Sequence, residues 1–157
     1  MLRLIPAGLH RLALRIGWRL RQRWRRFARP DIRGVGVLVR DEAGRVLLVR
    51  HSYGPAGWAV PGGGLGGAED PAEGARREMQ EELSLSLKEL RLVDERVETM
   101  TGCTHTGYLF HALAEGEPRA DGREIREARW FAPAELDTIP LTRITARRLT
   151  EQGLKGS

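Results

Sequence analysis

Residues 62–85 read GGGLGGAEDPAEGARREMQEELSL, and this stretch decides both the fold and the candidate site. It opens with three consecutive glycines, which allow backbone conformations closed to other residues and let a ligand approach closely. Asp70 is a favourable N-cap residue and Pro71 a favourable first helical residue, so we expect a helix to begin there. The stretch therefore predicts a glycine turn followed by a helix.

The predicted helix carries three acidic residues on one face. Glu78, Glu81 and Glu82 stand at positions i, i+3 and i+4, so their side chains point the same way. Like charges at this spacing destabilise a helix by roughly a few tenths of a kcal/mol per pair. Either the guanidinium groups of Arg76 and Arg77 or a divalent cation can offset the repulsion. Because Mg²⁺ takes carboxylate oxygens and a substrate phosphate as ligands, the acidic face beside the glycine turn predicts a magnesium site.

This segment resembles the Nudix box, G-x5-E-x7-R-E-U-x-E-E-x-G-U, in which U is a bulky apolar residue. The defined positions of the box fall on Gly63, Glu69, Arg77, Glu78, Met79, Glu81, Glu82, Ser84 and Leu85. Ser84 departs from the pattern, which has glycine there, and many relatives carry Glu in place of Gly66 and Gly in place of Ala68. Ser84 follows the helix, where a left-handed C-cap is common, and serine in that conformation costs about 1 kcal/mol.

The resemblance covers roughly residues 33–135 and implies an α/β Nudix fold, a mixed β-sheet sandwiched between helices. Alternating and β-branched residues predict strands over 32–40, 45–51, 88–99 and 104–114. A short helix is expected from Pro133.

A C-terminal helix is expected over 140–152, with Leu141, Ile144 and Leu149 facing inward. We expect the tail, residues 153–157, to be frayed.

The family resemblance also implies a reaction, the hydrolysis of a diphosphate linked to another group. The substrate would be a small-molecule diphosphate, with ADP-ribose-like compounds, sugar nucleotides and (d)NTPs all open. The resemblance makes Glu78, Glu81, Glu82 and the Gly62 carbonyl ligands of Mg²⁺, for which Mn²⁺ is a candidate substitute. Divalent cations neutralise phosphoryl oxygens and lower the pKa of bound water, which is the chemistry this reaction needs.

Two arrangements around these ligands are expected. Arg77 would orient a neighbouring carboxylate, with Glu69 as the candidate, through a bidentate hydrogen bond. In some relatives an acid six residues before a closing tryptophan joins the metal site or acts as the base. Glu124 holds that place relative to Trp130, Glu127 competes with it, and Glu81 acting through a bound water is the third alternative.

Substrate contacts are expected from the glycine turn and from the loop before it. Gly63 and Gly64 let a substrate approach the backbone, Tyr53 can stack on a base, and His51 can contact a phosphate. The alternative for Tyr53 and His51 is ordinary loop packing and surface exposure.

Charge divides the chain into two regions. Residues 1–29 hold nine arginines and no acid, which leaves 17 basic and 21 acidic residues in 30–157. A net acidic body argues against general nucleic-acid affinity there, so no specific nucleic-acid partner is expected. The single cysteine, Cys103, excludes an intramolecular disulfide and a multi-cysteine zinc site.

We therefore expect a basic amphipathic N-terminal helix within an extension, residues 1–29, followed by a Nudix domain over 30–157. The helix can pack on the body or in a homodimer, lie peripherally on an anionic membrane surface, or serve as a presequence. No stretch is long enough to span a membrane, and we expect a cytoplasmic protein. Two other functions stay open: a non-catalytic nucleotide-binding regulator, and a membrane-surface hydrolase of lipid-linked diphosphates.

Overall fold

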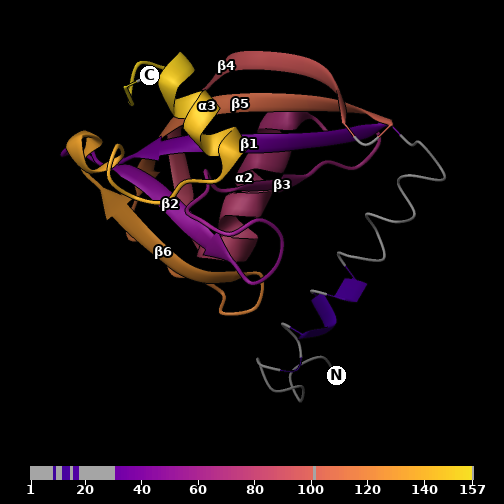
Figure 1. Cartoon of the computed structure of the whole chain (residues 1–157), viewed down its shortest axis with the longest axis horizontal. Helices are drawn as coiled ribbons and strands as arrows, with labels where there is room; N and C mark the ends of the chain where they lie inside the picture. Colours follow the sequence, from indigo (N-terminus) through magenta and orange to yellow (C-terminus); the bar gives the residue numbers. More distant parts are fainter. Residues whose placement is uncertain (1–8, 10–11, 15, 18–30, 101, 157) are drawn as a thin grey trace.

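A mixed β-sheet forms the centre of the protein (Figure 1). The structure is a computed structural model that describes residues 9, 12–14, 16–17, 31–100 and 102–156. Within them the strands are β1 (Ile32–Arg40), β2 (Val46–His51), β3 (Gly62–Gly64), β4 (Ser86–Met100), β5 (Cys103–Glu115) and β6 (Ile125–Phe131). Their order is β4-β5-β1-β2-β6, with β3 paired to β1. The β1–β5 pair is parallel and the other pairs are antiparallel, so the predicted mixed sheet is confirmed.

The first two strands form the predicted hairpin and then separate. The turn closes through the Gly44 N–H, which donates to the Asp41 carbonyl at 3.0 Å, and Gly44 takes a left-handed φ of 77°. Direct β1–β2 pairing is recorded at Arg40 and Val46, while the earlier half of β1 pairs with β3 instead. This arrangement brings the glycine turn alongside β1.

Helices cover both faces of the sheet. Helix α2 (Pro71–Leu83) lies behind the sheet in the view of Figure 1, and helix α3 (Arg143–Glu151) lies in front of it. Side chains alternate along β1, so that Val37 and Val39 enter the α2-side core while Leu38 enters the α3-side core. The predicted sandwich of helices around a sheet is therefore confirmed.

The C-terminal helix differs from its prediction in length and in one buried position. It begins at Arg143, because Thr142 takes an extended conformation and its side chain accepts a hydrogen bond from the Thr145 N–H. Leu149 is fully buried as predicted, but Ile144 is 42% exposed, so its prediction was wrong. Thr145 takes the inward position instead, one helical turn before Leu149, and its hydroxyl accepts the Val60 N–H at 3.0 Å.

Two further elements complete this end of the chain. The short helix expected from Pro133 is a 3-10 turn, η2 (Pro133–Glu135). Residues 153–156 are not frayed, in contrast to the prediction for the tail. Leu154 packs on the α3-side core, and the Lys155 ammonium lies 3.0 Å from the Asp137 carboxylate, so apolar burial and an ion pair hold the tail.

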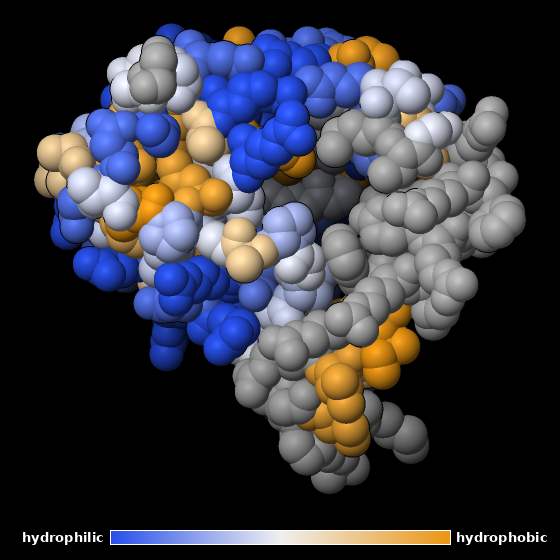
Figure 2. Space-filling view, viewed as in Figure 1, coloured by the Kyte–Doolittle hydropathy of each residue, from blue (hydrophilic) through white to orange (hydrophobic). Residues whose placement is uncertain are grey.

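Most of the predicted N-terminal helix lies outside the described residues. Those that are described, 9, 12–14 and 16–17, are helical, and Leu9, Leu12 and Ile16 are each more than half exposed. Hydrophobic side chains of this segment are visible in Figure 2 as an orange group away from the sheet. None of the described helices combines the length and the apolar character that a bilayer crossing requires. The division into an extension, 1–29, and a domain, 30–157, stays a prediction.

Candidate active site

Helix α2 begins and ends where the sequence indicates. The Asp70 carboxylate accepts hydrogen bonds from the N–H groups of Ala72 and Glu73 at 2.9 and 3.1 Å, and Pro71 opens the helix. Ser84 ends it with φ 50° and ψ 36°, in the left-handed region. Ser84 thus keeps the left-handed conformation expected at this C-cap.

The three glutamates of α2 differ in burial. Glu78 and Glu82 are buried, with 8% and 6% of their surfaces exposed, whereas Glu81 faces solvent. The Glu78 carboxylate lies directly against Gly63, since a Cβ added at Gly63 would collide with its oxygens. A Cβ at Gly62 would likewise collide with the backbone of β1. The two glycines therefore allow the turn to sit between β1 and the acidic face of α2.

Arg77 ties the glycine turn to the helix. Its guanidinium donates to both Glu69 carboxylate oxygens, from Nε at 2.7 Å and from Nη2 at 3.1 Å, which is the expected bidentate pair. It also donates to Glu78 at 2.9 Å and to Glu81 at 3.3 Å. The hydrogen bonds from Arg77, followed by the one from the Gly66 N–H, lower the pKa of Glu69 to about 2. Arg77 therefore binds both oxygens of Glu69, and it also donates to Glu78, to Glu81 and to the Gly64 carbonyl at 3.0 Å.

Glu82 receives no such compensation. Its Oε2 atom is buried without a hydrogen-bond partner among the described residues. Burial, followed by the charges of Glu78, Glu124, Asp121 and Glu81, raises the pKa of Glu82 to about 9. Burial also raises the pKa of Glu78, although Arg77 opposes that shift. The site thus concentrates more buried negative charge than its own arginine neutralises.

This donor set fits a hard divalent cation. Mg²⁺ binds carboxylate and backbone carbonyl oxygens. The buried Oε2 atom of Glu82 has no hydrogen-bond partner among the described residues, so a bound cation would stabilise the charged form of this carboxylate. Among the described residues, no three His, Cys, Asp or Glu side chains already form a metal-binding group. Glu78 and Glu81 instead share Arg77, so the arginine neutralises part of the acidic face.

The two candidate bases lie on different sides of the sheet. Glu124 accepts a hydrogen bond from the Tyr53 hydroxyl at 3.0 Å, and its charge contributes to the raised pKa of Glu82. Glu127 stands opposite Arg50 in the β2–β6 register, with 3.7 Å between the charged groups. The Arg50 guanidinium lies 4.6 Å from the centroid of the Trp58 ring, in the α3-side core. Glu124 therefore shares the electrostatic environment of the acidic helix, and Glu127 faces the other way.

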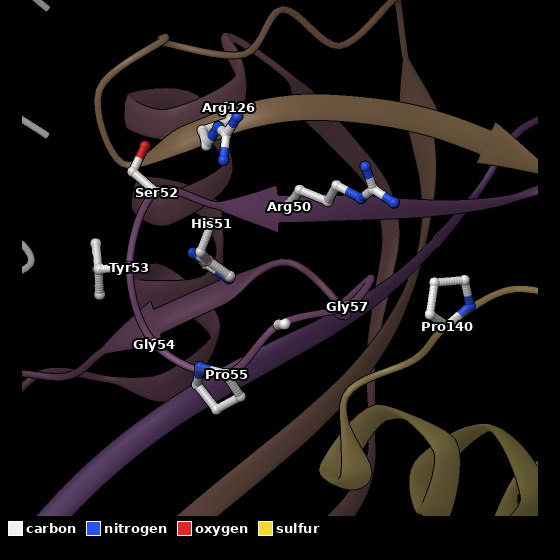
Figure 3. Close-up of a pocket in the computed structure, with 10 residues that line it drawn as sticks. Arg50, His51, Ser52, Tyr53, Gly54, Pro55, Gly57, Arg126 and Pro140 are labelled. Atoms are coloured by element: carbon white, nitrogen blue, oxygen red, sulfur yellow. The ribbon is translucent and has the colours of Figure 1, made fainter. Parts of the chain in front are cut away.

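A cavity of about 550 Å³ lies beside this site, at the loop that follows β2 (Figure 3). Its lining includes the predicted substrate residues His51 and Tyr53, together with Arg50 and Arg126. No acidic residue lines it in the described part of the chain. Burial lowers the pKa of His51, while the charges of Glu124 and Asp121 oppose that shift. The two arginines in its lining make the cavity suited to an anionic group.

The sequence pattern missed three residues of this region: Arg50, Arg126 and Asp121. The two arginines reach the cavity because β2 pairs with β6, a contact between segments about 75 residues apart that no local pattern reveals. Asp121 lies in a stretch of turn-forming residues, which carries no local signal for a site. Its N–H donates to the Glu82 carbonyl at 3.0 Å, which fixes that loop to α2.

Comparison with known proteins agrees with this geometry. The family model described as NUDIX domain matches residues 30–152. The chain belongs to the Nudix family. The predicted resemblance to the Nudix family is thereby confirmed.

Curated relatives of this Nudix chain include RNA pyrophosphohydrolases. The protein of that name from Photorhabdus laumondii is 29% identical over 100 residues, which are 62% of this chain and 51% of the relative. The one from Rhodospirillum rubrum is 39% identical over 54 residues, 34% of this chain and 33% of the relative. The matches thus span between a third and about half of these relatives' lengths.

Solved structures with the same fold include a MutT Nudix hydrolase from Burkholderia pseudomallei. It is 28% identical, with a TM-score of 0.67, and the match covers 78% of this chain and 97% of that one. The Nudix domain of Shewanella oneidensis NrtR, solved with ADP ribose, has a TM-score of 0.67 at 17% identity, over 78% of this chain and 86% of that one. The second likeness concerns the fold alone.

Proposed function

We propose that this Nudix protein is a Mg²⁺-dependent hydrolase that cleaves the diphosphate linkage of a nucleoside diphosphate derivative by attack of water on phosphorus. The observation that carries the proposal is the buried, unpartnered carboxylate oxygen of Glu82 beside Glu78 and the glycine turn. A buried charge without a partner is costly, and a cation that arrives with a polyanionic substrate removes that cost.

Glu78, Glu81, Glu82 and the Gly62 carbonyl would hold the cation, with Mn²⁺ as a candidate substitute. When bound, the cation supplies charge neutralisation at the phosphoryl oxygens and a lower pKa for water. Arg77 and Glu69 keep the turn against the helix, and their bidentate pair supports this positioning role.

Glu124 is the residue we assign as the base that accepts the proton of the attacking water. Its hydrogen bond to Tyr53 and its influence on Glu82 support a position at the acidic helix. Glu81 stays the alternative base because it is solvent-exposed on the same helix. The pairing of Glu127 with Arg50 argues against a role for Glu127.

The substrate would bind between the glycine turn and the cavity beside it. The diphosphate would contact the backbone of Gly63 and Gly64. His51 and Tyr53 line the cavity that would hold the attached group. Arg50 and Arg126 favour an attached group that is itself anionic. ADP-ribose-like compounds, sugar nucleotides and (d)NTPs remain the candidates, and the names of the curated relatives add RNA to them.

A substrate panel tests the proposal. Phosphate or nucleotide release is measured with Mg²⁺, with Mn²⁺ and with a chelator, and the Glu82→Gln variant serves as the control for contaminating activity. We expect metal-dependent release from at least one substrate by the wild type only. Tight nucleotide binding without release would instead support the non-catalytic regulator.

The exposed apolar residues of the N-terminal segment favour a second property, contact with an anionic membrane surface. Leu9, Leu12 and Ile16 are exposed, and residues 1–29 carry nine arginines without an acid. Such contact would suit a hydrolase of lipid-linked diphosphates. Sedimentation with anionic vesicles should pellet the full chain but not a chain that starts at Asp31, and equal pelleting would reject the idea. A homodimer through the same segment would appear as a change in sedimentation velocity without vesicles.

A further inference from the structure

The loop after β2 is fastened to Glu124 by two hydrogen bonds. The Ser52 N–H donates to the Glu124 carbonyl at 2.8 Å, and the Tyr53 hydroxyl donates to the Glu124 carboxylate at 3.0 Å. These contacts join segments 71 residues apart in the sequence, and the Tyr53 bond is partly buried. The wall of the cavity and the candidate base are therefore physically connected.

The backbone that carries Glu124 is fixed independently of Tyr53. The Asp121 carboxylate accepts the N–H groups of Arg123, Glu124 and Ile125 at 2.9, 3.3 and 2.9 Å. The Asp121 N–H in turn donates to the Glu82 carbonyl at 3.0 Å. With this backbone tied to the last turn of α2, the remaining freedom of Glu124 is rotation of its own side chain.

We propose that Tyr53 is a positioning residue whose hydroxyl fixes the orientation of the Glu124 carboxylate toward the acidic face of α2. This inference rests on the proposed function, in which Glu124 acts as the base. It differs from a base-stacking role, because stacking uses the ring of Tyr53 whereas positioning uses its hydroxyl. The two roles are separable by substitution.

Tyr53→Phe keeps the ring and removes the hydrogen bond. We expect kcat to fall by about 10- to 100-fold, because the hydrogen bond to the charged carboxylate of Glu124 is lost. KM should stay within about two-fold, because ground-state binding does not use this bond. Tyr53→Leu should lower kcat by a similar factor and also raise KM if the ring contacts the substrate. An unchanged kcat in Tyr53→Phe would overturn the proposal.

A double-mutant cycle shows whether Tyr53 acts through Glu124. In a Glu124→Ala background, Tyr53→Phe should have no further effect on kcat, because the acceptor is gone. The same loss in both backgrounds would contradict a positioning role. Wild-type activity in Glu124→Ala would reject the assignment of Glu124 as the base. The orientation of its carboxylate would then be tested by crystal structures.

Crystal structures of the wild type and of Tyr53→Phe supply that independent readout, which needs no turnover. The proposal predicts that the Glu124 carboxylate changes rotamer or loses order in the variant, while the Asp121 hydrogen bonds persist. An unmoved, well-ordered Glu124 would overturn the proposal even if no substrate of the enzyme were known. Absence of wild-type hydrolysis on the substrate panel, in contrast, would count against the proposed function.

Discussion

The two faces of the sheet each hold an ionisable side chain that has no salt-bridge partner among the described residues. On the α2 side it is the Glu82 carboxylate, and on the α3 side it is the guanidinium of the partly buried Arg148. Every aspartate and glutamate of the chain lies in the described part, and none of them comes within ion-pair distance of Arg148. Arg148 lies against Gly36 and Gly107, and a Cβ at Gly36 would collide with its Nη1.

The charged groups that shift the pKa of Glu82 are all acidic, whereas those around Arg148 are of both signs. Glu82 is surrounded by other acids, which add to the effect of burial on its pKa. Around Arg148 the charges alternate: Arg147 pairs with Glu98 at 2.8 Å, and Arg96 pairs with Glu151 at 2.9 Å. Burial, followed by the charge of Arg147, lowers the pKa of Arg148, while the nearby Asp94 and Glu98 oppose that shift. Glu82 therefore meets like charges that a bound cation would offset, whereas Asp94 and Glu98 already offset part of the charge of Arg148.

The largest expected effect is that of Glu82→Gln. Removing a charge that holds the cation should lower Mg²⁺-dependent turnover by at least about 100-fold, while the fold is kept. Steady-state hydrolysis and circular dichroism on the same preparations measure the two properties. The matched substitution on the opposite face, Arg148→Met, should leave turnover within about two-fold. Equal losses in the two variants would remove the distinction between the faces.

Activity should be nearly as sensitive to substitutions in the glycine turn. Gly63→Ala places a methyl group against the Glu78 carboxylate and should reduce kcat/KM by about 10- to 100-fold, because small displacements of a catalytic group are costly. Gly67→Ala is the matched control, since a Cβ there meets nothing within 4 Å. Similar activities of the two variants would show that the close approach of Gly63 to Glu78 has no effect on activity.

On the α3 side the expected effects concern stability. Gly36→Ala should lower the free energy of unfolding by at most about 1 kcal/mol, because the new methyl group meets the far end of the flexible Arg148 side chain, which can shift. Arg148→Met should be neutral or stabilising by about 1 kcal/mol, because it replaces a buried unpaired charge with an apolar side chain. In the double variant the cost of Gly36→Ala should shrink, as measured by urea denaturation. An undiminished cost would mean that Gly36 is required for another reason.

The smallest effect is a pH dependence from Glu69. Its folded-state pKa of about 2 lies below the ordinary value of 4.5, so the hydrogen bonds from Arg77 stabilise the protein above pH 4.5. That contribution is lost as the pH falls from 4.5 toward 2. The unfolding curves of wild type and Glu69→Gln should therefore converge with decreasing pH over this range. Curves that stay parallel would contradict the shift.

Local sequence signals predicted the acidic helix well. Asp70 and Pro71 fix its start through the N-cap, and Ser84 takes the left-handed position at its end. The Arg77–Glu69 pair followed from the family pattern because both residues lie within one turn–helix unit.

Contacts between distant strands could not be predicted in the same way. The register of β2 against β6 shifts between Arg50 and His51, so alternation along either strand does not tell which face Glu124 and Glu127 occupy. The placement of Arg148 over Gly36 depends on how α3 packs on the sheet. Helical periodicity alone predicts Ile144 inward, because it does not tell how this helix is rotated against the sheet. Tertiary packing, rather than local periodicity, decides these positions.

We expect the acidic face of α2 to bind a cation because the buried Oε2 atom of Glu82 has no hydrogen-bond partner in the part of the chain that the structure describes. Anomalous diffraction from crystals soaked in Mn²⁺ and a non-hydrolysable diphosphate tests it most directly. We expect an anomalous peak in contact with the carboxylates of Glu82 and Glu78. A soaked crystal without such a peak, in which Glu78 and Glu81 stay bonded to Arg77 and Glu82 stays buried and unpaired, would contradict it.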